Sequence, residues 1–398
     1  MNWETKRLEE VADFCLGKML DQKKNRGELM PYLANINVRW GEFEMSELRQ
    51  MRFEPHEMDR YGLRYGDIVM CEGGEPGRCA IWKEQQSGMM IQKALHRIRP
   101  HERLRPEFLF YYFLHKGRLG HFSSLYTGST IKHLPREKLA LIEVPIPPLH
   151  EQTRIADILS AYDDLIENNR RRIALLEESA RLLYREWFVH LRFPGHEHVK
   201  IIDGVPEGWE RRPIAELTDY LGRGIAPKYD DNAECIVVNQ KCIRGGLVNL
   251  ELARAQSKTF SSERQLVDGD VLINSTGEGT LGRVAQIFSP PEVCTVDSHV
   301  TIARPCKTIG KHYFGISLIQ LESVFSTMGR GATNQTELSK QQIGEIQIYQ
   351  PCGQVILHFE KTVAHLRTMV HTLSRQNVFL SQARDHLLPK LMSGEVEV

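Results

Sequence analysis

The sequence has none of the short motifs that identify several common enzyme classes. It contains no G-x-x-x-x-G-K-[ST] loop, no G-x-S-x-G, no H-E-x-x-H and no Asn/Asp-Pro-Pro-aromatic tetrapeptide. These patterns belong to Walker-type ATPases, serine hydrolases, zinc proteases and DNA amino-methyltransferases. Their absence argues against these four activities.

Paired cysteines, long apolar runs and an excess of charge are also missing. None of the 8 cysteines forms a C-x-x-C pair, so we expect neither a zinc ribbon nor a thioredoxin-like site. His196 and His198 have no third or fourth ligand near them in the sequence, so we expect no other metal site. No apolar run approaches the roughly 18 residues of a membrane span. The first ten residues, MNWETKRLEE, are charged where a signal peptide is apolar, so we expect a cytoplasmic protein. Since 51 Lys+Arg balance 51 Asp+Glu, any contact with nucleic acid has to come from local basic surfaces.

One glycine motif is present, and it invites a nucleotide-binding interpretation. Residues 273–287 (INSTGEGTLGRVAQI) place Gly277, Gly279 and Gly282 in G-x-G-x-x-G spacing after an apolar run. A dinucleotide-binding loop is followed directly by a helix. Here the next residues are too few for a helix and run into Pro290 and Pro291. The motif therefore favours a turn between two strands over a phosphate-binding loop.

The sequence repeats itself with a period of a little over 200 residues, which predicts two similar domains. The matching stretches are 8–13 with 214–219, 65–70 with 268–273, 127–130 with 330–333, and 142–148 with 346–351. The counterpart of the glycine motif is 69–81 (VMCEGGEPGRCAI), which keeps Gly-Arg but contains Pro76. Proline has no N–H for a phosphate cradle. What the two copies share is a strand, a wide glycine turn and a second strand.

Each copy ends in a long helical pattern. Residues 149–191 contain no proline, and their apolar residues recur in alternating steps of four and three, which is the heptad seam of a coiled coil. The second copy covers residues 355–388, and Pro389 is expected to end it. The predicted seam consists of Ile155, Leu159, Tyr162, Ile166, Asn169, Ile173, Leu176 and Leu183, and of Val363, Leu366, Val370, Leu373, Asn377 and Leu380.

Asn169 and Asn377 interrupt the otherwise apolar seams. They can fix the register and pairing of the helices at a cost in stability, or they can contact a partner subunit, and we favour the first interpretation. Two seams in one chain most simply pair with each other. If they pair antiparallel, the chain forms a rod with one domain at each end, related by a pseudo-two-fold axis. About 33 helical residues would separate the domains by about 50 Å, or roughly 15 base pairs of DNA.

With this layout the whole chain resembles the specificity subunits of type I restriction-modification systems. The most specific likenesses are residues 144–155 (VPIPPLHEQTRI), residues 387–395 (LLPKLMSGE) and the duplicated Gly-Asp hairpins. The resemblance implies an α+β fold in which two target recognition domains are joined by two long antiparallel coiled-coil helices. The expected divisions are 1–148 for the first recognition domain, 149–200 for the central helix, 201–351 for the second domain and 352–398 for the C-terminal helix.

The resemblance also implies a function and partners. The chain would have no catalytic activity and would bind no cofactor itself. It would direct two methyltransferase subunits, which carry S-adenosylmethionine, to adenines in a bipartite site on double-stranded DNA, and restriction subunits would join them for cleavage. One departure is residues 349–354 (YQPCGQ), a weak copy of residues 146–152, so the partner contacts at the two helix starts need not be identical. The alternatives are a free-standing sequence-specific DNA-binding protein and a nucleotide-using enzyme.

Candidate DNA contacts come from stretches that match between the copies and contain residue types that read bases or bind phosphate. Residues 35–41 (NINVRWG) match residues 238–246 (VNQKCIRGG), with Asn37 matched to Gln240 and Arg39 to Arg244, and residues 127–133 match residues 330–335. Arg78 and Arg283 follow the glycine turns, where they can face phosphate or pair with Asp67 or Asp270. The candidates are Lys23, Lys24, Arg26, Asn37, Arg39, Trp40, Arg78, Thr130, Lys132, His133, Gln240, Lys241, Arg244, Arg283, Thr333, Asn334 and Gln335.

Overall fold

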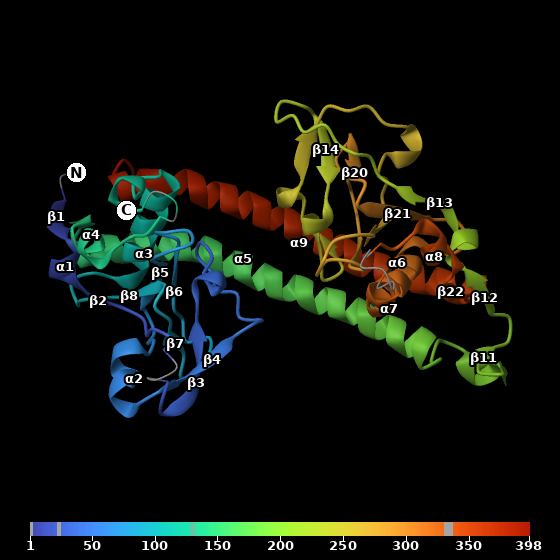
Figure 1. The fold of residues 1–398 in the computed structure, drawn as a ribbon, viewed down its shortest axis with the longest axis horizontal. Helices are drawn as coiled ribbons and strands as arrows, with labels where there is room; N and C mark the ends of the chain where they lie inside the picture. Colours follow the sequence, from blue (N-terminus) through green and yellow to red (C-terminus); the bar gives the residue numbers. More distant parts are fainter. Residues whose placement is uncertain (1–2, 22–24, 129, 131, 330–336) are drawn as a thin grey trace. The chain divides into compact units, whose positions relative to one another are not determined.

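The computed structural model describes residues 3–398 apart from 22–24, 129, 131 and 330–336. The chain forms two compact units. Unit 1 consists of Met1–Arg170 and Ser374–Val398, and unit 2 consists of Arg171–Leu373. In each unit, a domain of sheets and short helices packs against parts of two long helices (Figure 1). The predicted α+β class with two similar domains is confirmed.

Unit 1 contains a four-stranded antiparallel sheet, a three-stranded sheet with one parallel pair, and a separate strand pair. Listed across each sheet, these are β2 (Ala12–Leu16), β8 (Leu95–Pro100), β5 (Ile68–Cys71) and β6 (Cys79–Ile81); β4 (Arg49–Phe53), β3 (Glu28–Leu33) and β7 (Met90–Ile91); and β1 (Glu4–Arg7) with β9 (Glu143–Ile146). Strand β5 is buried along its whole length, as its unbroken apolar sequence requires.

Unit 2 repeats these sheets in the same order, so the duplication read from the sequence is a duplication of topology. Its sheets are β13 (Thr218–Arg223), β21 (Val300–Pro305), β18 (Val271–Asn274) and β19 (Val284–Gln286); β17 (Arg254–Gln256), β14 (Cys235–Val238) and β20 (Cys294–Val296); and β12 (Glu210–Pro213) with β22 (Gln347–Gln350). Two hairpins are additional: β10 (Ile201–Ile202) with β11 (Val205–Pro206), and β15 (Ile243–Arg244) with β16 (Leu247–Val248).

Short helices place each sheet domain on the long helices. In unit 1 these are α1 (Leu8–Val11), α2 (Pro55–Tyr61), α3 (Pro106–Arg118) and α4 (Arg136–Ala140), and in unit 2 they are α6 (Lys311–Gln320), α7 (Glu322–Met328) and α8 (Lys340–Glu345). Seven consecutive residues of α3, Phe108 to Leu114, are buried. One side of α3 therefore packs on the sheet and the other on the long helices, and all three share one hydrophobic core.

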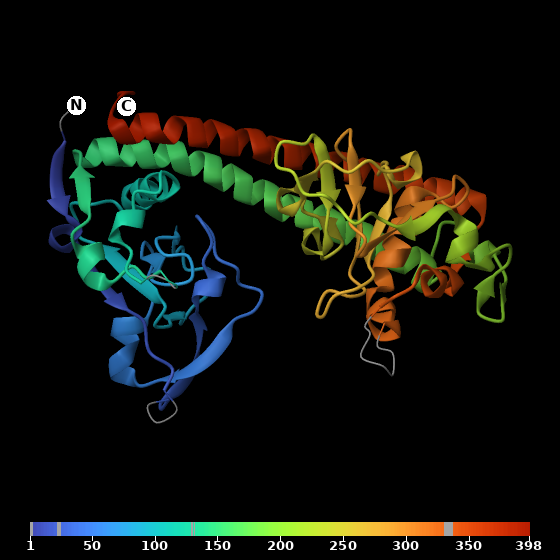
Figure 2. The same ribbon diagram turned by 45° about the horizontal axis from the view of Figure 1, so that its top comes forward.

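The long helices are α5 (Leu149–Tyr184) and α9 (Gly353–Ser393). Within each unit their segments lie side by side (Figure 2). In unit 1 Asp163 pairs with Arg384 and Asn169 hydrogen-bonds Asn377, so residue numbers rise on one helix as they fall on the other. This confirms the antiparallel pairing. No helix among the described residues is long and apolar enough to cross a membrane.

The predicted seam faces the partner helix. Ile155, Leu159 and Ile166 on α5 are buried, as are Val363 and Leu373 on α9. The remaining predicted seam residues are buried or partly buried. Asn169 and Asn377 meet across the seam, where the Asn169 Nδ2 donates to the Asn377 Oδ1 at 3.0 Å. This geometry fits the pairing interpretation of the two asparagines.

Two expectations about the helix ends are wrong. The first helix is α-helical only to Tyr184 and continues as a π-helical turn over Arg185–Val189, with His190 N donating to Arg185 O. This wider turn allows the adjacent Trp187 and Phe188 both to enter the core. Pro389 does not end α9 but lies inside it. A proline inside a helix costs about 3 kcal/mol, and here burial of Leu388, Leu391 and Met392 on the last turns offsets that cost.

Candidate nucleic-acid interface

The glycine motif is a hairpin turn, as predicted. In unit 2, β18 pairs antiparallel with β19 on either side of the turn, and in unit 1, β5 pairs with β6 in the same way. A Cβ on Gly282 would lie 2.4 Å from the backbone nitrogen of Ser326, and one on Gly77 would lie 2.6 Å from the ring of Phe122. Both turns thus need glycine because they pack closely on the segment after the neighbouring helix. A strand follows the motif, not the helix that a phosphate-binding loop requires.

An amide side chain lies beneath each turn. In unit 2 the Gln240 Nε2 donates to the Thr276 backbone oxygen and, at 3.0 Å, to its hydroxyl. A Cβ on Gly277 would lie 2.7 Å from that Nε2, and a Cβ on Gly74 would lie 2.6 Å from the Asn35 Nδ2. Asn35 is therefore the structural counterpart of Gln240. The sequence comparison matched Gln240 with Asn37 instead, and this match is wrong by two residues.

Asn37 is buried, with 3% of its surface exposed. Its Oδ1 accepts from Ala34 N at 3.0 Å, and its Nδ2 donates to the carbonyl oxygens of Glu44 and Glu47. Both polar groups of the side chain thus hold the loop that follows β3. We remove Asn37 from the candidate contacts, because it has no free donor or acceptor and no access to a ligand.

The residues after the amide remain at the surface. Arg39, Lys241 and Arg244 are exposed, and Arg39 and Arg244 occupy equivalent places two residues beyond matching 3₁₀ turns. Trp40 is partly buried. Its Nε1 donates to Glu75 Oε1 at 3.2 Å, and its ring lies against Gly117 of α3. Trp40 thus supports the glycine turn from the side, and Arg39, Lys241 and Arg244 are the exposed candidates of these two segments.

The turn arginines are used inside the domains. Arg78 pairs with Glu75 and donates to the Asn35 carbonyl at 2.9 Å, and Arg283 donates to Gly279 O at 2.9 Å. The alternative of pairing with Asp67 or Asp270 is wrong. Those carboxylates are occupied by other arginines, Arg99 in unit 1 and Arg304 in unit 2, each through two hydrogen bonds. Hydrogen bonding to Asp67 raises the pKa of Arg99, and hydrogen bonding to Asp270 raises the pKa of Arg304.

The second matched loop of unit 1 contacts the glycine turn, and in both units the residues just after this stretch bond the same part of the turn. His133 and Thr127 exchange backbone hydrogen bonds at 2.9 Å, and the His133 ring lies 3.2 Å from the Glu72 carboxylate, at the start of the glycine turn. Leu134 N donates to Glu72 O at 2.8 Å, and in unit 2 Leu338 N donates to Ser275 O at 2.8 Å. The chain after the loop is thus attached to the turn in the same way in both units. Thr130 and Lys132 are exposed on it.

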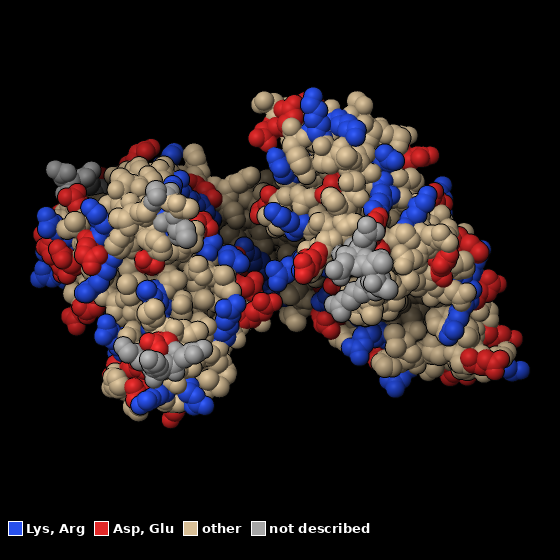
Figure 3. Space-filling model, in the orientation of Figure 1, with Lys and Arg blue, Asp and Glu red and all other residues tan. Residues whose placement is uncertain are grey.

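Some predicted contacts lie outside the described residues, namely Lys23, Lys24, Thr333, Asn334 and Gln335. Arg26, near the first two, is exposed. On the face in view, Lys and Arg are interspersed with Asp and Glu over both units (Figure 3). This agrees with the balanced composition, and on this face specific side chains, not a broad basic field, would have to hold DNA.

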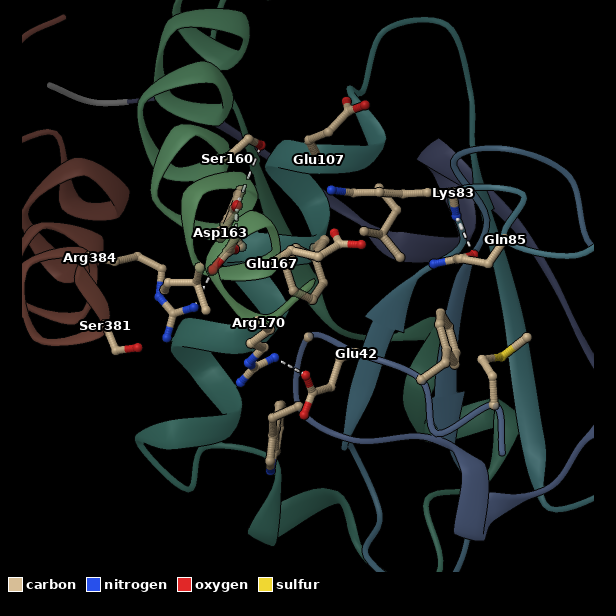
Figure 4. A pocket seen from close by; sticks show the side chains of 18 of the residues that line it. Glu42, Lys83, Gln85, Glu107, Ser160, Asp163, Glu167, Arg170, Ser381 and Arg384 are labelled. Atoms are coloured by element: carbon tan, nitrogen blue, oxygen red, sulfur yellow. Dashed lines mark hydrogen bonds and ion pairs between the residues drawn. The ribbon is translucent and has the colours of Figure 1, made fainter. Parts of the chain in front are cut away.

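Unit 1 also has a polar hollow of about 460 Å³ between its sheet domain and the two helices (Figure 4). Arg170 of α5 pairs with Glu42 at its rim, and the Tyr111 hydroxyl donates to Asp163 at 2.7 Å deeper inside. Asp163 also pairs with Arg384 of α9. Basic and acidic side chains alternate around the hollow and bond one another, which makes it a structural contact more than a receptor for a charged ligand.

Metal-binding side chains meet at one place in the part of the chain that is described, on α2, where Glu54, His56 and Glu57 approach one another. Glu57 is paired with Lys18, and its carboxylate accepts from the backbone nitrogen of Glu54 at 2.9 Å. The Glu57 carboxylate thus caps α2 and binds a lysine. The 8 cysteines are all free. Burial raises the pKa of Cys71 and Cys79 beside the glycine turn, which keeps these thiols protonated.

Comparison with known proteins gives consistent results. The sequence profile of the family described as "Type I restriction modification DNA specificity domain" matches residues 1–178. The specificity subunit of the type I restriction enzyme MjaIX of Methanocaldococcus jannaschii is 25% identical over 100% of this chain and 94% of its own length. That of HindI of Haemophilus influenzae is 21% identical over 98% of this chain and 100% of its own.

A solved structure supports the fold. The crystal structure of the type I restriction-modification S subunit from M. genitalium superposes with a TM-score of 0.55 at 18% sequence identity, and it covers 98% of this chain and 96% of its own. The likeness extends over both sheet domains and both long helices.

Proposed function

We propose that the chain is a specificity subunit of a type I restriction-modification system, and that it directs two methyltransferase subunits to adenines in a bipartite DNA target. Each sheet domain would read one half of the target, and the paired helices would set the untouched spacer between them. The observation that carries the proposal is the repeated surface: in both units a glycine turn, an amide loop and a helix-leading loop meet at one end of the main sheet.

The proposal accounts for differences between the two copies. The described parts of the two surfaces share their backbone plan but differ in the side chains that they present. Asn35, Trp40 and His133 in unit 1 stand against Gln240, Gly245 and Glu337 in and beside the matching segments of unit 2. Two domains with one fold and two sets of side chains suit two different half-sites. We therefore expect an asymmetric DNA target whose two halves are separated by a spacer of fixed length.

The chain itself would be non-catalytic, since its sequence carries none of the motifs of methyl transfer or ATP hydrolysis. S-adenosylmethionine would be bound by the methyltransferase subunits, which would dock on the long helices. Restriction subunits would join this complex for cleavage, in the cytoplasm. A free-standing DNA-binding protein is the competing reading, and it differs in requiring no partner for its effect on DNA.

A methylome tests the proposal. The chain is expressed with its neighbouring methyltransferase in a methylation-free host, and modified adenines are mapped by single-molecule sequencing. We expect a two-part motif with a fixed gap, present only when this chain is present. Methylation that is the same without the chain would reject the targeting role and favour the free-standing protein.

Matched variants then assign each half of the motif to a domain. Arg39→Ala in unit 1 should relax one half only, and Arg244→Ala in unit 2 the other half only, because a base-reading arginine is worth about 1–3 kcal/mol of discrimination. Arg64→Ala is the control, since Arg64 is exposed at the opposite end of β5 from the glycine turn. A change in both halves from one substitution would mean that the domains do not read separately.

A further inference from the structure

Polar pairs cross the seam between α5 and α9 at three levels. In unit 1, Asp163 pairs with Arg384, as Figure 4 shows, and Asn169 hydrogen-bonds Asn377 at 3.0 Å. In unit 2, Glu177 lies 3.5 Å from Arg367, with side chains only 11% and 15% exposed. The Asn377 Nδ2 also lies 3.5 Å from the Ile166 carbonyl, so both amides of the central pair have partners. Each pair joins one residue of α5 to one residue of α9.

The two helices are repeats of each other, and the repeat fixes which residues are equivalent. Helix α5 begins at Leu149 and α9 at Gly353, and the seams align Ile155 with Phe359 and Leu159 with Val363. In this alignment the polar residues do not coincide. The equivalent pairs are Asn169 with Leu373, Ile173 with Asn377, Asp163 with Arg367, Glu177 with Ser381, and Ala180 with Arg384.

This offset matters if α5 meets a second copy of itself. In the observed antiparallel register Asn169 faces Asn377, whose equivalent on α5 is Ile173. Two α5 helices paired in the same way would set each Asn169 against an Ile173, twice over. Asp163 would face Ala180, the equivalent of Arg384. Both changes leave a largely buried polar group without its partner.

The same holds for two copies of α9. Asn377 would face Leu373, again twice, and Arg384 would face Arg367, the equivalent of Asp163. Both arginines are largely screened from solvent, with side chains 13% and 15% exposed. Two like charges at that depth repel each other, and Arg384 keeps only Asp385, its neighbour on the same helix, as a partner. If either helix pairs with a second copy of itself, one asparagine and one charged side chain thus lose their partners at each end of the pair.

We propose that these three pairs make α5 select α9 and reject a second copy of either helix. They would ensure that two different sheet domains, never two identical ones, share one coiled coil. The inference rests on the helix contacts and the internal repeat, and it stands whether or not the sheet domains read DNA. Apolar seams alone would not give this choice, because both helices carry the same heptad pattern.

The test uses substitutions in the full-length chain that place, between α5 and α9, the same residue pairs that self-pairing would produce. Asn377→Ile installs the residue that α5 has at this level, and Asn169→Leu installs the residue that α9 has. Each single variant sets one asparagine against an apolar partner, and the double variant removes both asparagines. We expect each single substitution to raise the unfolding equilibrium constant of unit 1 about tenfold, and the double variant to be at least as stable as the original chain.

The readout is urea unfolding of all four proteins, followed by a fluorescent label on unit 1. Asn168→Leu and Gln376→Ile are the matched controls, because both positions are exposed next to the seam asparagines and should give changes below about twofold. Single variants that are as stable as the double variant would overturn the proposal, since the asparagines would then impose no choice of partner.

A second variant tests the charge at the outer level of unit 1. Asp163→Arg sets an arginine against Arg384, as self-pairing of α9 would, and adding Arg384→Asp restores a pair of opposite sign. We expect the single variant to destabilise unit 1 and the added change to recover most of the loss. Equal stability of the single and double variants would show that charge at this level does not contribute to the choice of partner helix. The proposal would then be wrong for the pair Asp163 and Arg384.

Discussion

In unit 2 aromatic rings form much of the contact between the sheet domain and the long helices, whereas unit 1 adds exposed ion pairs to its apolar contact with the same helices. Phe188 of the π turn lies 4.5 Å from Tyr313 of α6 and 4.9 Å from Phe359 of α9, measured between ring centroids. In unit 1, Arg170 pairs with Glu42 and Lys83 lies 3.0 Å from Asp164. The same fold is thus held on the same two helices by burial in one case and partly by ion pairs in the other.

The volume of the hollow beside this contact also differs between the two units. Trp40, Glu42 and Tyr111 line the hollow of about 460 Å³ in unit 1. At the matching place in unit 2, Gly245, Leu247 and Ile316 leave only about 20 Å³. Small and aliphatic residues close the gap, and long polar ones hold it open with water-accessible pairs. A duplicated fold can therefore keep its topology while the strength and salt sensitivity of its attachment diverge.

The largest loss of stability is expected when the buried ion pair that both units contain is removed. Asp67 and Asp270 are almost wholly buried, and each is held by two hydrogen bonds from an arginine. Asp67→Ala and Asp270→Ala should each destabilise their own unit by about 3–5 kcal/mol, because each leaves a half-buried guanidinium without its carboxylate. Urea unfolding of each variant measures the loss. Asp59→Ala, which removes an exposed pair with Arg64, is the control and should cost less than about 1 kcal/mol. Clearly unequal losses would mean that the two pairs are equivalent in geometry but not in energy.

The contact between sheet domain and long helices can be compared between the two units by truncating one equivalent seam residue in each unit. Phe359 and Ile155 are both fully buried at the same level of the repeat. Phe359→Ala should cost unit 2 about 3–5 kcal/mol and Ile155→Ala should cost unit 1 about 2–4 kcal/mol, since the ring makes four aromatic contacts and leaves the larger cavity. Thermal unfolding of the two variants gives the ranking. Leu357→Ala, at an exposed site on α9, should change stability by less than about 0.5 kcal/mol. A larger loss in unit 1 would reverse the comparison.

Much of the fold could be read from the sequence because it depends on strong periodic signals. The heptad pattern gave the long helices, and the internal repeat gave two copies of one topology. The details that the sequence did not predict are places where the burial of side chains outweighs the local preference of the backbone. Pro389 remains inside α9 because the residues around it fill the core of unit 1, and the π turn forms because adjacent rings at Trp187 and Phe188 are both buried.

The candidate interface was less predictable, since hydrogen-bond partners depend on three-dimensional neighbours. The sequence indicated which loops match, and the structure brings those that are described to one end of each sheet. It could not indicate that Asn37 is turned inward, or that Asn35 and not Asn37 lies beneath the glycine turn. Gln152 shows the same limit. It is fully buried and bonds Arg105 N, Arg103 O and Pro147 O, and its counterpart on α9 is the apolar Ile356. This difference gives a structural reason for the divergent sequence at the start of the second helix.

A smaller difference between the units is their response to acid. His312 of α6 is 4% exposed and its ring stacks on Phe288, and burial lowers its pKa to about 4. A histidine with a lowered pKa is neutral in the folded state, so its contribution is intact above about pH 6.5 and is lost as the pH falls toward 4. Between pH 8 and pH 5 unit 2 should lose about 2 kcal/mol through this group.

His312→Gln should remove this part of the pH dependence, as measured by thermal unfolding of unit 2 at the two pH values. His365→Gln, at an exposed site on α9, is the matched control and should leave the dependence unchanged. In unit 1 the position equivalent to His312 is Glu107, but burial also lowers the pKa of His96 there. An acid response of unit 2 that survives His312→Gln would place its origin in other buried groups.

The smallest expected effect is the most direct test of how unit 1 is attached. Arg170 and Glu42 are about half exposed, so the coupling between Arg170→Ala and Glu42→Ala in a double-mutant cycle should be about 0.5–1 kcal/mol at low salt. At about 1 M salt the screening length falls to roughly 3 Å, and the coupling should disappear. The cycle is measured by urea unfolding of unit 1 at both salt concentrations. A coupling that persists at high salt would mean that the pair is shielded from solvent, and the attachment of unit 1 would then be as insensitive to salt as the ring cluster of unit 2.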